Sequence, residues 1–298
     1  MPVALTRRAF GAAALASLVG CARARAAASP TSTPAEEQDA AERARAIVDA
    51  KVGALFYVPR IRGRPGVGRI AKFAHWARAA ERLGIDAIED VDRAFACAGY
   101  SSSEDSVLLL EHSLDPAAAL VALQRAAGGA LAPTAPAAFP STSVKIQDRP
   151  MELGLPRPGL FALVPSWAAP MLAELADVGG LPHPRGDEAA RFYAFQPALT
   201  LDTPPEWPPT IGASQAEITF DDEGGAHVLF QATSTSPEQA KIDAAAMEKT
   251  LDDLLHIDLT IIRIPIFDPI HFSADGSVVR MSAYLLASDV DWLLGFGA

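Results

Sequence analysis

The sequence feature that most constrains the fold is a pair of landmarks that recurs at one spacing. Asp115-Pro116 and Ser236-Pro237 each follow an apolar, strand-like run and open a helix-like segment, and they lie 121 residues apart. The strand-like runs that begin at Val107 and Val228 have the same separation. A spacing shared by several landmarks is typical of internal duplication.

The two halves predict an α+β fold. Each half contains two strand-like runs around a polar turn, followed by a capped helix, and Ser166 and Ser288 each open a further expected helix. We therefore expect two similar units, at residues 36–194 and 195–298, each a mostly antiparallel sheet with helices packed on one face.

Composition supports a packed core without covalent crosslinks. Half of the 298 residues are hydrophobic, and the chain has only two cysteines, Cys21 and Cys97. If Cys21 is used for another purpose, no internal disulfide can form. Cys97 lies in the apolar run 94–98, so we expect it to be a small buried hydrophobic residue.

The N-terminus has the pattern of an export signal. Arg7 and Arg8 precede a modest apolar run at 11–20, which is too short to span a bilayer. The paired arginines followed by Phe10 resemble a twin-arginine export signal. Leu-Val-Gly-Cys at 18–21 resembles the lipobox of bacterial lipoproteins, which implies that Cys21 becomes the lipid-attached N-terminus of the mature chain.

Two alternatives to this processing remain open. Paired arginines also occur in general secretory signals, and cleavage by the general signal peptidase after Ala26 or Ala28 would give a soluble exported protein. The resemblance covers 1–21 as the export signal and implies a location in the periplasm or cell envelope, without an activity. Residues 22–35 are rich in Ala, Arg, Ser, Pro and Thr and are expected to form a flexible tether.

The charge balance bears on the partner. The chain carries 25 basic and 36 acidic residues, a formal net charge of -11. This excess disfavours nucleic acid as a partner, because phosphate binding depends on Lys and Arg. The membrane, reached through the lipid anchor, and an envelope protein are the expected partners.

No motif in the sequence names a reaction. The six histidines form no pair at helical spacing, and the sequence contains neither His-Glu-x-x-His nor Gly-x-Ser-x-Gly. We therefore expect no catalytic residues, no metal and no cofactor. His112 is expected to be a structural residue near the helix cap at Asp115.

One basic segment is a candidate anion-binding site. Arg60, Arg62, Arg64 and Arg69 surround a glycine-rich stretch before an expected helix, and helix N-termini present free N–H groups. The segment lacks the ending of a P-loop, so an ordinary basic loop is the alternative. The carboxylates of 89–92 and 221–223 are interpreted as turn residues.

These observations favour a non-enzymatic binding or assembly module anchored in the envelope. One alternative is a hydrolase whose site is assembled from scattered residues, which would require convergent polar groups in a pocket. The other is a carrier of a lipid or small hydrophobic ligand, which would require an apolar cavity between sheet and helices.

Overall fold

The computed structural model describes the globular part of the chain. The described residues are 39–64, 75–100, 105–129, 139–146, 149–201, 207–254, 256–259, 262–265 and 270–290. The candidate residues Arg7, Arg8, Phe10, Cys21 and Arg69 lie outside these ranges.

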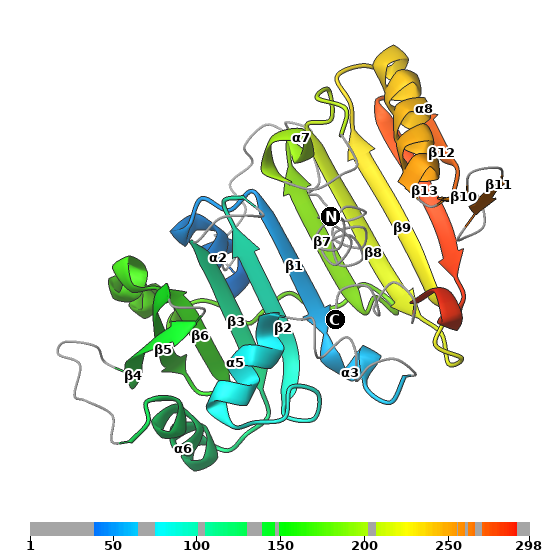
Figure 1. Cartoon of the computed structure of the whole chain (residues 1–298). Coiled ribbons are helices and arrows are strands. Elements are labelled where there is room, and N and C mark those ends of the chain that lie inside the picture. The colour runs from blue at the N-terminus through cyan, green and yellow to red at the C-terminus, as the bar shows by residue number, and fades with distance from the viewer. Residues whose placement is uncertain are drawn as a thin grey trace, which may run out of the picture.

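A single antiparallel sheet of eleven strands forms the centre of the molecule (Figure 1). A separate two-stranded hairpin consists of β10 (His256–Leu259) and β11 (Ile262–Pro265). From one edge to the other, the large sheet contains β12 (Phe272–Asp275), β13 (Val278–Leu285), β9 (Ala226–Thr233), β8 (Ala213–Phe220), β7 (Ala190–Phe195), β1 (Val52–Tyr57), β2 (Val91–Ala98), β3 (Ser106–His112), β6 (Leu160–Pro165), β5 (Arg149–Arg157) and β4 (Ser141–Ile146).

The expectation of two separate units is wrong, because β7 joins the strands of both halves. On one side of β7, Arg191 is opposite Leu55 of β1, and on the other side it is opposite Glu217 of β8. A strand at 190–195 was not expected from the sequence. Its residues Ala-Arg-Phe-Tyr-Ala-Phe do not alternate strictly between apolar and polar, so the usual sign of a half-buried strand is missing.

Helices cover both faces of the sheet, which also corrects the expectation of helices on one face. The first face, called here the α8 face, carries α5 (His75–Leu83), α6 (Pro116–Ala126) and α8 (Pro237–Leu254). The opposite face, called here the α2 face, carries α2 (Ala40–Ile47) and the 3-10 helix η1 (Ser166–Leu175). Figure 1 shows α5 and α8 in front of the sheet and α2 behind it. Two short helices, α3 (Val58–Ile61) and α7 (Pro197–Thr200), flank the central strands β1 and β7.

Three apolar clusters hold these layers together. On the α8 face, one cluster lies under α8 around Phe230, and another lies under α5 and α6 around Phe161. On the α2 face, the third cluster lies under α2 and η1 and contains Cys97, which is 3% exposed as expected. Because successive side chains of a strand point to opposite faces of the sheet, neighbouring residues of each strand pack into clusters on opposite faces.

Local helix signals were mostly confirmed. The Asp115 carboxylate accepts hydrogen bonds from the N–H groups of Ala117 and Ala118, both at 2.9 Å, and so caps α6. Ser236 caps α8 through a hydrogen bond from the N–H of Gln239 at 3.1 Å. The expected cap at Ser166 is wrong, because η1 begins directly after Pro165 and has no side-chain cap. None of the described helices has the length and apolarity to cross a bilayer.

Candidate functional site

Helices pack on one half of the α2 face and not on the other half, among the described residues. Over β2, β3 and β6 this face is buried under α2 and η1. Over β8, β9 and β13 no described helix packs on it, whereas the other side of the same strands is buried under α8. We call this uncovered surface the open face. Its outward residues are Gln215, Glu217, His227, Leu229, Gln231, Arg280, Ser282 and Tyr284.

The strand register places an exposed apolar side chain at the centre of the open face. Leu229 lies between Glu217 of β8 and Ser282 of β13, and it is 51% exposed. His227 is directly opposite Tyr284, and their ring centroids are 4.7 Å apart. Tyr284 is 45% exposed. The open face therefore combines an aliphatic residue and an aromatic pair with amide and charged groups on a rigid support.

A charged cluster lies where the open face meets the covered part. Glu188 is 2% exposed, and its carboxylate accepts two hydrogen bonds from Arg191, from Nε at 2.6 Å and from Nη2. Glu217 lies 3.3 Å from Arg185 Nη1 and 4.0 Å from Arg191 Nε. This cluster was not expected from the sequence, because the strand β7 that carries Arg191 was not expected, although Glu188 and Arg191 lie only three residues apart.

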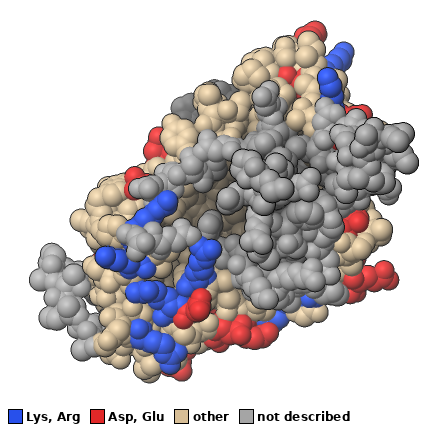
Figure 2. All heavy atoms as spheres, in the orientation of Figure 1, with Lys and Arg blue, Asp and Glu red and all other residues tan. Residues whose placement is uncertain are grey.

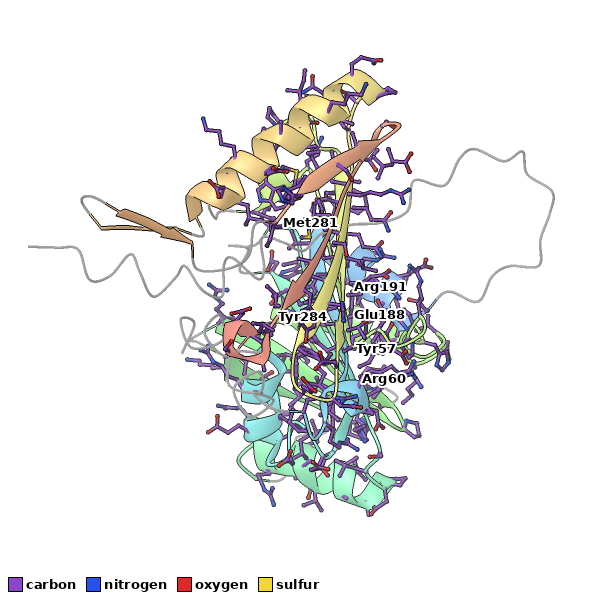
Figure 3. All side chains as sticks on the ribbon, turned by 90° about the vertical axis from the view of Figure 1, so that its right-hand side faces the viewer. Tyr57, Arg60, Glu188, Arg191, Met281 and Tyr284 are labelled. Carbon is purple, nitrogen blue, oxygen red and sulfur yellow. The ribbon has the colours of Figure 1, made fainter. Side chains whose placement is uncertain are left out.

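Tyr57 borders the same cluster from β1. Its hydroxyl donates a hydrogen bond to the carbonyl oxygen of His183 at 2.9 Å. Burial raises the pKa of Tyr57 to about 12, so the phenol is neutral at physiological pH. Figure 3 shows Tyr57, Glu188 and Arg191 on the side of the sheet opposite α8. Tyr57, Glu188 and Arg191 all bond to groups of the protein itself, so they stabilise the border of the open face.

A second buried ion cluster holds the connection between η1 and β7 against the α2 face. The Glu111 carboxylate accepts hydrogen bonds from the N–H of Leu181 at 2.7 Å and from Arg157 Nη2 at 3.2 Å, and it pairs with Arg93 at 2.5 Å. Gly180 packs closely here, since a Cβ at this position would lie 3.0 Å from Glu111 Oε1. Arg93 also donates to the carbonyl oxygens of Leu181 and Pro182.

The described arginines of the candidate anion-binding segment all have internal partners. Arg60 pairs with Asp187, Arg64 pairs with Asp222, and Arg62 donates to the carbonyl oxygens of Ile88 and Glu89. Exposed basic residues also occur on α5 (Arg78 and Arg82) and α6 (Arg125). Figure 2 shows basic side chains gathered on this part of the surface.

The carboxylates at 221–223 and those of Glu89 and Asp90 lie in or beside turns, but Asp92, also expected in a turn, lies in the strand β2. Asp221 Oδ1 accepts from the N–H groups of Glu223 and Gly225, and its Oδ2 accepts from the Tyr284 hydroxyl at 2.7 Å. Asp86 and Asp90 likewise bond to backbone N–H groups of their own turn. Within the described ranges, no group of three or more His, Cys, Asp or Glu side chains could hold a metal ion.

The structure places the remaining sequence candidates apart from these clusters. The His112 ring packs on Phe161, with centroids 4.5 Å apart, while the Asp115 carboxylate is used by the cap of α6. Burial raises the pKa of the Cys97 thiol to about 12, so this cysteine is inert, as expected for a core residue.

Comparison with protein-family models, with curated proteins and with solved structures finds no match to this chain.

Proposed function

We propose that this chain is an exported, lipid-anchored binding or assembly module whose open face binds an envelope protein. The observation that carries the proposal is the unequal cover of the α2 face. Antiparallel sheets often have one solvated face, but here the exposed strands present Leu229 and Tyr284 among amide and charged groups. Protein–protein interfaces commonly have this arrangement, with a few apolar or aromatic anchor residues at the centre and polar residues at the rim.

The sequence signals support the location of this module. Arg7, Arg8 and Phe10 favour export, and Cys21 favours attachment to a membrane. A tether at 22–35 would allow the sheet to reach a partner at some distance from the bilayer. The net charge of -11 is consistent with a protein partner rather than with nucleic acid.

The test compares two exposed positions on opposite sides of the second half. A photo-crosslinking amino acid is placed at Gln231 on the open face or, as the matched control, at Ile242 on the outer side of α8, which is 61% exposed. We expect a discrete crosslinked adduct in intact envelopes from position 231 and none from position 242. Equal adducts from both positions, or none from 231, would contradict the proposal.

A single substitution then tests the central anchor. Leu229→Arg introduces a charge at the middle of the open face and should abolish the adduct formed from position 231. Because Leu229 is half exposed, the free energy of unfolding should change by only about 0.5 kcal/mol. An unchanged adduct in this folded variant would exclude the open face as the binding surface.

One observation favours the carrier as a second candidate. On the α8 face, the central residues Ala54, Phe56, Ala96 and Phe192 are only half buried, and Phe56 touches the clusters of both halves. Phe56 packs on Trp76 and Phe192, with ring centroids 4.5 and 5.1 Å apart. Saturable binding of a fluorescent fatty acid that Phe56→Asp abolishes would support the carrier, and no binding would remove it.

A further inference from the structure

His112 is a buried histidine whose ring has no polar partner. Its side chain lies at the end of β3 and is 6% exposed. Neither ring nitrogen has a hydrogen-bond partner among the described residues, although the neutral ring carries one N–H donor and one acceptor. Buried polar groups are nearly always satisfied, and each exception requires an explanation.

The strand opposite His112 contains an irregularity. His112 is opposite Val91 of β2, but the next pair is Glu111 with Arg93, so Asp92 is the extra residue of a β-bulge. Asp92 is half buried. The Ser113 N–H donates to the Asp90 carbonyl oxygen at 3.3 Å, which ties the end of β3 to the turn before the bulge.

Within the part of the chain that the structure describes, the two charged side chains that act on the ring, Asp92 and Asp90, are both acidic. Burial lowers the pKa of His112 below the ordinary value of a histidine, and the charges of Asp92 and Asp90 act in the opposite direction. The ring also contacts Phe161 of β6, which is apolar. Glu111 and its arginine partners lie on the α2 face, on the other side of the sheet, and Asp115 caps α6.

We propose that His112 and the bulge at Asp92 form an acid-sensitive switch, in which protonation moves the imidazole from Phe161 toward the carboxylates of Asp92 and Asp90. In the neutral form the ring is part of the apolar cluster under α6. In the charged form the ring requires a carboxylate, and two lie on the adjacent segment: Asp92 in the bulge of β2 and Asp90 in the turn before it. The movement would loosen the pairing of β3 with β2 and β6 near His112 and would leave the strands β8, β9 and β13 intact.

The direction of the pH effect follows from proton linkage. A histidine that is kept neutral in the folded state binds fewer protons than in the unfolded chain, so stability falls as the pH drops below about 6.5. One coupled proton gives at most about a tenfold change in the opening equilibrium per pH unit.

The experiment measures amide hydrogen exchange of the full mature protein from pH 7.5 to 5, corrected for the intrinsic effect of pH. We expect protection of the amides at 110–113 and 159–161 to fall by about tenfold per pH unit below the transition, while amides of β8 and β9 keep theirs. Unchanged protection at 110–113, or an equal loss throughout the sheet, would overturn the proposal.

Three variants separate the switch from general acid sensitivity. His112→Phe should remove the pH dependence of amide protection at 110–113. If the Phe variant does not fold, His112→Gln replaces it, because glutamine also cannot be protonated in this pH range. Asp92→Asn should move the transition to lower pH, because it removes the carboxylate that attracts the charged ring. His271→Gln, an exposed histidine on the other half, should change nothing. An unshifted transition in Asp92→Asn would refute the role of the bulge.

Discussion

The carboxylate of Asp243 on α8 lies 2.5 Å from the hydroxyl of Ser234, the residue that follows β9. Asp243 is 1% exposed and also accepts hydrogen bonds from Thr210 Oγ1 at 2.6 Å and from Gln239 Nε2 at 2.8 Å. One buried side chain therefore joins α8 to β9 and to the loop before β8. Such a buried polar network stabilises the fold only while every member is satisfied.

The first prediction concerns this junction. Asp243→Ala leaves three hydrogen-bond donors without their acceptor and should lower the free energy of unfolding by about 3 kcal/mol. Urea denaturation followed by circular dichroism measures the loss. Glu238→Ala on an exposed part of the same helix is the control and should change stability by about 0.5 kcal/mol or less. Similar values for the two variants would show that the network contributes little.

A second prediction concerns the ion pair at the edge of the open face. Arg191→Ala removes the partner of Glu188, a carboxylate that is 2% exposed, and should destabilise the protein by about 3 kcal/mol. Glu188→Gln combined with Arg191→Ala should recover part of this loss, because no uncompensated charge is then buried. Arg185→Ala removes an exposed pair with Glu217 and should cost less than about 1 kcal/mol. A double variant no more stable than Arg191→Ala alone would contradict this explanation.

The third prediction tests anchoring. Cys21→Ala should abolish acylation and move the mature protein from the membrane fraction to the soluble fraction. Incorporation of labelled palmitate and fractionation of the envelope measure the two effects. Continued incorporation in the variant would refute the lipobox interpretation.

A fourth prediction tests the export route. Arg7→Lys together with Arg8→Lys should block export, since the twin-arginine route requires the arginines themselves, and unprocessed precursor should accumulate in the cytoplasm. Processing is measured by pulse-chase labelling. Normal processing of the double variant would indicate the general secretory route instead.

Local features of the fold could be predicted because short-range physics determines them. The caps at Asp115 and Ser236 depend on side chains that bond within three residues of their own position. The hairpins at 221–225 and 276–277 depend on Asp and Gly in tight turns, and Gly276 has the positive φ of +58° that such a turn requires.

The candidate surface could not be predicted to the same extent. The sequence predicted a strand at 226–233, and the structure shows that its residues alternate between buried and exposed. Whether a helix covers the other face depends on segments far away in the sequence, such as α2 and η1, which pack on the first half of the sheet. Likewise, the spacing of Arg60, Arg62 and Arg64 suggested an anion site, but Asp187, Ile88 and Asp222 are brought to them by the fold.

The sequence by itself predicted the strands around each polar turn, the caps at Asp115 and Ser236, the burial of Cys97, and an export signal that stays a prediction. Only the tertiary structure decided that the halves share one sheet, since β7 pairs with β8, which follows it in the chain, and also with β1, whose residues lie more than a hundred positions before it. The physical reason is that backbone pairing between strands does not depend on side-chain identity. An inconspicuous segment such as 190–195 can therefore hold the centre of the sheet.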